Sequence, residues 1–283
     1  MSESRSIELG IQPRADWRDP EQYRNLLEYD CVGWAGEWLR RNPDFVADVL
    51  RVPCLPYTAQ SPRDDDTRIS NCGRACTLSR WGLRCCRIDE EPVFFWLPQC
   101  NPLVLPVETI AAPGPADAFD IRRCASLKAG LRGVDRELHL LFSDGPRTLQ
   151  IVLIDDPPLD GPVMFRCRLC GWCDFEAKPL SLRRLCSLYR RGRLLKTLYP
   201  PEQRARRWMD MARAWDGLKD GARQRDIAAA LFGERAARTG WDDGYRTRVQ
   251  RLVRAAERMV GGGYLGLLRG EEEGEFGPGS GEP

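Results

Sequence analysis

The sequence predicts an α+β chain with an N-terminal domain of helices and short strands, a small antiparallel β-sheet region, and a C-terminal all-helical domain of the helix-turn-helix type. Three observations predict it. Apolar residues recur at helical spacing near the start and over the last third, β-forming runs with turn residues fill the middle, and a Pro/Gly/Ala stretch at 111–119 interrupts these runs. We expect domains at 15–111, 117–178 and 179–269, and a disordered acidic tail at 270–283.

The N-terminal helices have clear start and stop signals. Asp19 followed by Pro20 predicts a helix start, with Asp as the cap and Pro in the first turn. Trp34 and Trp38 are four residues apart, which predicts a buried aromatic stripe on a second helix, and Asn42-Pro43 predicts a break and a new start. Residues 53–75 are expected to form a surface loop, with the three aspartates at 64–66 solvated.

Strand signals occupy the middle of the chain. Four prolines between 81 and 110 favour short edge strands. The run RELHLLFSDGPRTLQIVLID predicts a hairpin that turns at 143–146, and PVMFRCRL at 162–169 predicts a further strand. A helix is expected at 180–198.

Three helices are predicted in the last third of the chain. The first, at 202–221, places Trp208, Met211, Ala212 and Trp215 on one face. The second, at 222–233, ends at a glycine. The third, at 244–263, follows a connection longer than the minimal helix-turn-helix turn, and aspartates at 242 and 243 can cap it.

The third of these helices has two contrasting faces. At about 100° per residue, its apolar side chains cluster on one side, namely Tyr245, Val249, Leu252, Val253, Ala256 and Val260. The opposite side is basic. Arginine can bind guanine or phosphate and glutamine can bind adenine, so we predict that this helix reads DNA. The predicted DNA-binding residues are Arg246, Thr247, Arg248, Gln250, Arg251, Arg254 and Arg258 on the helix, Gln224 and Arg225 before it, and Arg190, Arg191 and Arg193 as phosphate contacts.

Charge is distributed unevenly along the chain. Residues 1–160 contain 19 Lys/Arg and 25 Asp/Glu, residues 161–270 contain 24 and 11, and residues 271–283 contain 0 and 5. A basic segment next to an acidic one is typical of nucleic-acid-binding proteins, because Lys and Arg that neutralise phosphates release counterions. Double-stranded DNA is therefore the predicted partner.

The cysteines are conspicuous but are predicted to be ordinary thiols. Cys167, Cys170 and Cys173 have a spacing that can ligate zinc. A closed site needs a fourth ligand, for which Cys186 and Cys124 are the candidates, and the sequence has no separate second C-x-x-C knuckle. The only histidine, His139, lies in an apolar strand and is expected to be structural. No nucleophile or phosphate-loop motif is found, so we predict no enzyme activity and no cofactor.

Neither membrane nor export signals are found. The apolar runs are far shorter than the roughly 20 residues that span a bilayer. The first ten residues carry mixed charge and no apolar core of signal-peptide length. We therefore expect a cytoplasmic protein without membrane contact.

At these same residues the chain resembles a known bacterial family. The stretches YPPEQRARRWMDMARAWDGLKDGARQRDIAAALFGE and YRTRVQRLVRAAERMVGGGYLGLL resemble the DNA-binding domain of the type VI secretion transcription factor RovC, and DWRDPEQY and YDCVGWAGEWLRRNPDFVADV resemble the regulator domain that commonly precedes it. The resemblance implies a transcriptional regulator, often an activator, of secretion genes or of mobile-element transfer genes. It also implies homo-oligomers and adds RNA polymerase or a regulatory protein as a partner.

Two alternatives to a DNA-binding regulator remain. One is an interaction adaptor or antiactivator, in which the C-terminal helices bind a protein and the basic face is incidental. The other is a zinc-dependent enzyme that uses the cysteine array or the acidic loop. Salt-dependent DNA binding distinguishes a regulator from an adaptor, and metal analysis tests the enzyme.

Overall fold

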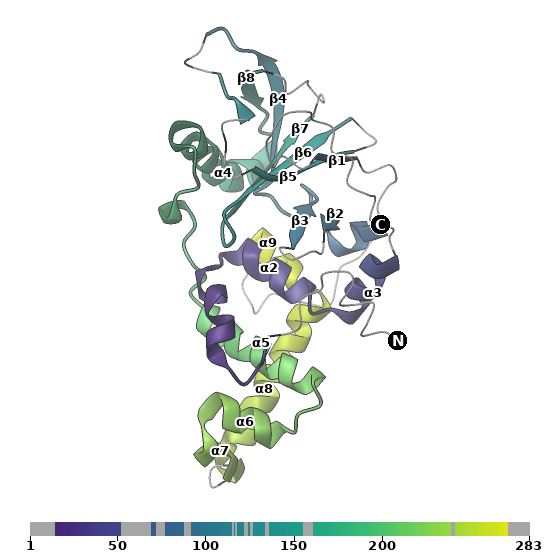
Figure 1. Cartoon of the computed structure of the whole chain (residues 1–283), viewed down its shortest axis with the longest axis vertical. Coiled ribbons are helices and arrows are strands. Elements are labelled where there is room, and N and C mark those ends of the chain that lie inside the picture. The colour runs from purple at the N-terminus through teal and green to yellow at the C-terminus, as the bar shows by residue number, and fades with distance from the viewer. Residues whose placement is uncertain are drawn as a thin grey trace. The chain divides into compact units, whose positions relative to one another are not determined.

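The chain folds into two compact units (Figure 1). The computed structural model describes residues 15–51, 69–71, 77–87, 92–114, 116, 118–121, 124, 127–133, 136–154, 161–238 and 241–270. The terminal unit combines residues 1–45 with residues 200–283, and the central unit consists of residues 46–199. The predicted α+β fold is confirmed. Most of the expected loop at 53–75 and all of the tail at 271–283 lie outside the described residues.

Residues 15–51 contain three helices, and a side chain caps the start of each, with Asn42 accepting from the amides of Asp44 and Phe45 at the third. Their bounds are η1 (Pro20–Glu28, a 3-10 helix), α2 (Cys31–Leu39) and α3 (Pro43–Arg51), the last of which crosses the boundary between the units. Asp19 accepts from the Glu21 amide, and Asp30 accepts from the amides of Val32 and Gly33. These bonds satisfy donors that a helix start leaves unpaired, and they confirm the predicted start at Asp19.

The C-terminal part of the terminal unit is helical throughout. The elements are α5 (Ala205–Lys219), α6 (Gln224–Phe232), α7 (Glu234–Arg238), a π-turn η5 (Trp241–Tyr245), α8 (Arg246–Arg258), a second π-turn η6 (Met259–Gly263) and α9 (Tyr264–Arg269). Helices α5, α6 and α8 pack against one another (Figure 1). The long connection after α6 thus contains its own short helix.

Tryptophans from both ends of the chain form the core of the terminal unit. Trp34 and Trp38 in α2 stack with their ring centroids 5.8 Å apart, and Trp208 in α5 meets Trp34 edge-on at 5.4 Å. All three side chains are fully buried. The predicted aromatic stripe on α2 and the predicted apolar face of α5 therefore both lie in the core, where they pack against each other.

The central unit is built on a six-stranded sheet. Its strand order is β1-β5-β6-β7-β4-β8, and a separate hairpin pairs β2 with β3. The bounds are β1 (Ile69–Asn71), β2 (Leu83–Arg87), β3 (Val93–Trp96), β4 (Leu105–Ala111), β5 (Leu127–Arg132), β6 (Leu138–Ser143), β7 (Thr148–Leu153) and β8 (Val163–Cys167). Strands β6 and β7 form the predicted hairpin, and β8 is the predicted further strand.

The sheet is larger than expected and is mixed rather than purely antiparallel. β4 runs parallel to β7, and β1 runs parallel to β5. The Pro/Gly/Ala stretch at 111–119 suggested a domain boundary, but β4 pairs with β7 and β8, which lie beyond it in sequence. The composition of this stretch predicts an irregular connection, but it does not indicate whether the strands on either side belong to one sheet.

One long helix packs on the central sheet. Helix α4 (Gly171–Arg191) begins nine residues before the predicted start at 180 and ends at Gly192, whose φ is +66°. Only a 3-10 turn, η4 (Lys196–Leu198), follows before the terminal unit resumes. Leu185 and Leu188 of α4 join Leu140 and Ile151 of the sheet in one apolar core. The predicted helix at 180–198 therefore stops early, because a left-handed glycine ends it.

Candidate nucleic-acid interface

Helix α8 presents a basic face to solvent. The side chains of Arg246, Thr247, Arg251, Arg254 and Arg258 are exposed. The opposite face is buried through Val249, Ala255, Ala256, Met259 and Val260. The buried stripe thus includes Ala255 and Met259, which the periodicity did not single out. Three residues predicted on this face, Tyr245, Leu252 and Val253, are only half-buried. The exposure predicted for the arginines is observed, and their contact with DNA stays a prediction.

Arg248 and Arg225 lie over aromatic rings of the same unit. The Arg248 guanidinium carbon is 4.6 Å from the ring centroid of Phe232, at the end of α6, and Arg225 lies 5.5 Å from Trp241. Such cation–π contacts contribute about 0.5–1 kcal/mol at exposed sites. Arg248 therefore also holds the end of α6 against α8, and Arg225 holds α6 against η5, the π-turn before α8.

Two glutamines join α6 to α8 beside this basic face. Gln250 Nε2 donates to Gln224 Oε1 at 3.5 Å, and both side chains are half-buried. Gln224 is the first residue of α6, so the amide pair fixes the start of α6 to the first half of α8. The structure brings these two predicted residues together with the α8 arginines.

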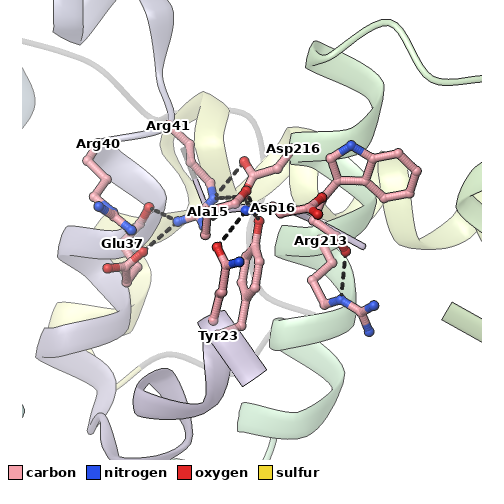
Figure 2. Close-up of polar contacts among 10 residues, drawn as sticks. Ala15, Asp16, Tyr23, Glu37, Arg40, Arg41, Arg213 and Asp216 are labelled. Atoms are coloured by element: carbon pink, nitrogen blue, oxygen red, sulfur yellow. Dashed lines mark hydrogen bonds and ion pairs between the residues drawn. The ribbon is translucent and has the colours of Figure 1, made fainter. Parts of the chain in front are cut away.

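A buried ionic cluster ties α5 to the N-terminal segment (Figure 2). Arg41 Nη2 donates to Asp216 Oδ2 at 2.9 Å and Arg41 Nε donates to Asp216 Oδ1 at 3.1 Å, while Arg41 Nη1 donates to Glu37 Oε2 at 2.5 Å. Tyr23 donates its hydroxyl to Asp216 Oδ2 at 2.8 Å. The side chains of Glu37, Arg41 and Asp216 are all less than one-tenth exposed.

Mutual attraction favours the charged forms of Arg41 and Glu37. Burial alone would lower the pKa of Arg41, but the carboxylates of Asp216 and Glu37 raise it above its ordinary value. Burial would likewise raise the pKa of Glu37, but Arg40 and Arg41 hold it below its ordinary value. Burial, and then the Asp216 carboxylate, raise the pKa of the Tyr23 phenol. Arg40 Nε also donates to Glu37 Oε2 at 2.7 Å, so two guanidinium groups face the two carboxylates, and pairing of this kind is what buried charges require.

Arg213 and Asn42 add two further links between the chain ends. Arg213 Nε donates to the Trp17 carbonyl at 3.0 Å, and its Nη2 donates to the carbonyls of Arg18 and Ala230 at 3.1 Å each. Asn42 Nδ2 donates to the Val260 carbonyl at 3.0 Å, within the π-turn that follows α8. Residues 17–42 therefore hold both the support helix α5 and the end of α8.

The arginines at the end of α4 lie in the other unit. Arg190, Arg191 and Arg193 are exposed and belong to the central unit, whereas α6 and α8 belong to the terminal unit. Helix α4, which carries Arg190 and Arg191, is fixed to the segment before β4. Its buried Lys178 donates to the carbonyls of Pro102 and Val104 at 2.6 and 2.7 Å. These arginines therefore lie on a different unit from the α8 face.

The cysteine array lies at the connection between β8 and α4. Cys167 ends β8, Cys170 precedes the first residue of α4, and Cys173 lies within α4. The side chain of Cys173 is not described. Among the described residues, no group of three or more His, Cys, Asp or Glu side chains is placed to hold a metal ion. His139 is buried in β6 with its ring edge-on to Phe95, in keeping with a structural role.

Two family models match the chain at the regions that carry this architecture. Residues 175–269 match the model described as the DNA-binding domain of a type VI secretion system transcription factor of the RovC type. The chain carries a RovC-type DNA-binding domain. Residues 16–86 match a proteobacterial transcriptional regulator-like domain. Both resemblances predicted from the sequence are confirmed, and a search of curated proteins gives no match.

The RovC-type domain and the regulator-like domain indicate a transcriptional regulator with a DNA-binding domain, for which DNA is the supported partner. Each matched region contributes to both structural units: 16–86 divides at 45/46 and 175–269 divides at 199/200. None of the helices among the described residues is both long and apolar enough to span a membrane. The α8 face thus lies on a unit that the two matched regions build jointly.

The sequence did not lead us to predict the ionic cluster of Glu37, Arg41 and Asp216. Glu37 lies between Trp34 and Trp38 in sequence, and Asp216 directly follows Trp215. Charged residues inside an otherwise apolar helical segment were the available signal, because burial of a charge requires a partner. The sequence did not indicate which partner, since Arg41 and Asp216 are separated by 175 positions.

Proposed function

We propose that this chain is a sequence-specific DNA-binding regulator of transcription that contacts its operator through the outer face of α8. The observation that carries the proposal is the exposed row of Thr247, Arg251, Arg254 and Arg258 on a helix whose other side is buried, inside a RovC-type domain. A helix with this division can enter the major groove, where its N-terminal residues meet base edges. In this arrangement Arg258 binds a phosphate.

We further propose that the protein activates secretion genes or mobile-element transfer genes in the cytoplasm, as a homo-oligomer that also contacts RNA polymerase or a regulatory protein. The description of the matched domain as part of a type VI secretion transcription factor supports the secretion genes. Genome-wide footprinting of bound sites, followed by transcript measurement after deletion of the gene, tests regulon and direction together. Sedimentation of the purified protein with and without operator tests the oligomer.

Two single substitutions test the reading face. Arg251→Ala and Arg254→Ala each remove an exposed guanidinium from α8 without opening a cavity, so we expect weaker operator binding with unchanged thermal unfolding. Arg24→Ala is the matched control, because Arg24 is an exposed arginine of η1 in the same unit. Wild-type affinity in both α8 variants would reject α8 as the recognition helix.

The adaptor alternative makes a different prediction for the same protein. A protein-binding helix has no reason to show DNA affinity that falls steeply with salt, whereas phosphate contacts give such a dependence through counterion release. Titration of the wild-type protein into a promoter duplex between low and physiological salt separates the two functions. A Kd that does not respond to salt would favour the adaptor.

A further inference from the structure

The hydrogen-bonded amides of Gln224 and Gln250 lie beside the exposed arginines of α8. Gln250 lies in the first half of α8, four residues after Arg246 and four before Arg254. Residues at this spacing share one helix face, so Gln250 lies between two exposed arginines along α8. Gln224 approaches from the start of α6 and accepts from Gln250 Nε2.

The hydrogen bond between the two amides determines what Gln250 can offer a ligand. A glutamine amide has two N–H donors and a carbonyl acceptor. Gln250 Nε2 lies 3.5 Å from Gln224 Oε1 and donates one N–H to it, so this bond does not use the second N–H or Oε1 of Gln250. A donor beside an acceptor complements adenine, which presents N7 as acceptor and the N6 amino group as donor in the major groove.

The neighbouring arginines cannot supply this complement. A guanidinium donates but does not accept, so Arg246 and Arg254 fit guanine or phosphate and not the adenine edge. Within the row of Arg246, Gln250 and Arg254, only the amide combines a donor with an acceptor. The row therefore has one position suited to an A·T pair, with a purely donating side chain on each side of it.

We propose that Gln250 is the specificity-determining residue for one adenine of the operator, and that Gln224 is a positioning residue that fixes the orientation of the Gln250 amide. This inference rests on the proposed function, since it assigns a base to the same face. Gln224 acts through Gln250 and needs no base contact of its own.

The test is selection of bound sequences from a random duplex library by the full-length protein and its variants. We expect a wild-type motif with an A·T pair that Gln250→Ala recognises less selectively, by roughly 5- to 150-fold in relative affinity at that pair. Gln224→Ala should relax the same pair in part. Gln224→Glu should retain the preference, because its carboxylate still accepts from Gln250 Nε2. Gln203→Ala, a change at an exposed glutamine before α5, is the control and should leave the motif unchanged.

Each outcome separates this inference from the proposed function. A motif that keeps its full A·T preference in Gln250→Ala overturns the inference and leaves sequence-specific binding intact. Absence of any selected motif from the wild-type protein overturns the proposed function itself. If Gln224→Ala lowers stability yet keeps the wild-type base preference, the pair is only a bridge between α6 and α8 and the positioning role is rejected. Salt slopes should equal that of wild type, because neither glutamine neutralises a phosphate.

Discussion

Arg41 and Asp216, which are 175 positions apart in the sequence, form a bidentate ion pair. Arg41 lies in the turn between α2 and α3, Asp216 lies in α5, and the side chains are 7% and 5% exposed. The pair joins the regulator-like region to the helix that supports α6 and α8. The unit with the candidate DNA-binding face is thus made from both ends of the chain, and its stability depends on residues far from that face.

Removal of the Arg41 guanidinium should destabilise the terminal unit strongly. Arg41→Met leaves the buried charges of Asp216 and Glu37 without their shared partner, so we expect the free energy of unfolding to fall by about 3–5 kcal/mol in urea denaturation at pH 7. Arg18→Met is the control, because Arg18 pairs with Asp16 and Asp220 with its side chain 58% exposed, and such pairs contribute about 0–1 kcal/mol. Equal losses in the two variants would contradict a stabilising role for the buried cluster.

A fragment cut at the bounds of the RovC-type match should not fold cooperatively. Residues 175–269 lack Trp34 and Trp38, so the fully buried Trp208 would be exposed to water. We expect residual helicity by circular dichroism, binding of a hydrophobic dye and no sharp thermal transition. Co-expression with residues 15–45 should restore a cooperative transition. A sharp transition in the isolated fragment would show that α5 to α9 form a stable core without the N-terminal helices.

Acid should remove the contribution of the Glu37 charge to stability. Its folded-state pKa lies below the ordinary value of 4.5, so its stabilisation is fully present above that value and is lost as pH falls through the folded-state pKa. The difference in unfolding free energy between wild type and Glu37→Gln should therefore be large at pH 7 and shrink below about pH 4.5. Urea titrations at several pH values measure it. A difference independent of pH would mean that Glu37 contributes by packing and not by charge.

Local patterns predicted the elements well, because helix starts, hairpin turns and apolar stripes are encoded by neighbouring residues. Asp19, the turn at 143–146 and the two-faced α8 all lie where the sequence indicated. The candidate face followed from the same periodicity, since exposure of Arg251 and Arg254 requires only that α8 be helical and buried on its other side.

Long-range pairing was not predictable from those patterns. The parallel pairing of β4 with β7 and the ion pair of Arg41 with Asp216 depend on which segments meet, and neither leaves a local signal. The early end of α4 shows a second limit. A glycine inside an apolar periodic stretch is compatible with a continued helix, and only the backbone at Gly192 decides that the helix stops.

Salt dependence of operator binding can locate the phosphate contacts. Each neutralised phosphate adds about −0.9 to the slope of log K against log salt, so Arg258→Ala should reduce the magnitude of the slope by about that amount. We expect similar reductions for Arg190→Ala, Arg191→Ala and Arg193→Ala, which would assign phosphate contacts to the central unit as well. Fluorescence anisotropy on a promoter duplex measures the slopes, with Arg24→Ala as the control. A guanidinium that releases no counterion does not contact the DNA. Unchanged slopes in the three central-unit variants, together with a smaller slope for Arg258→Ala, would therefore limit the phosphate contacts to the terminal unit.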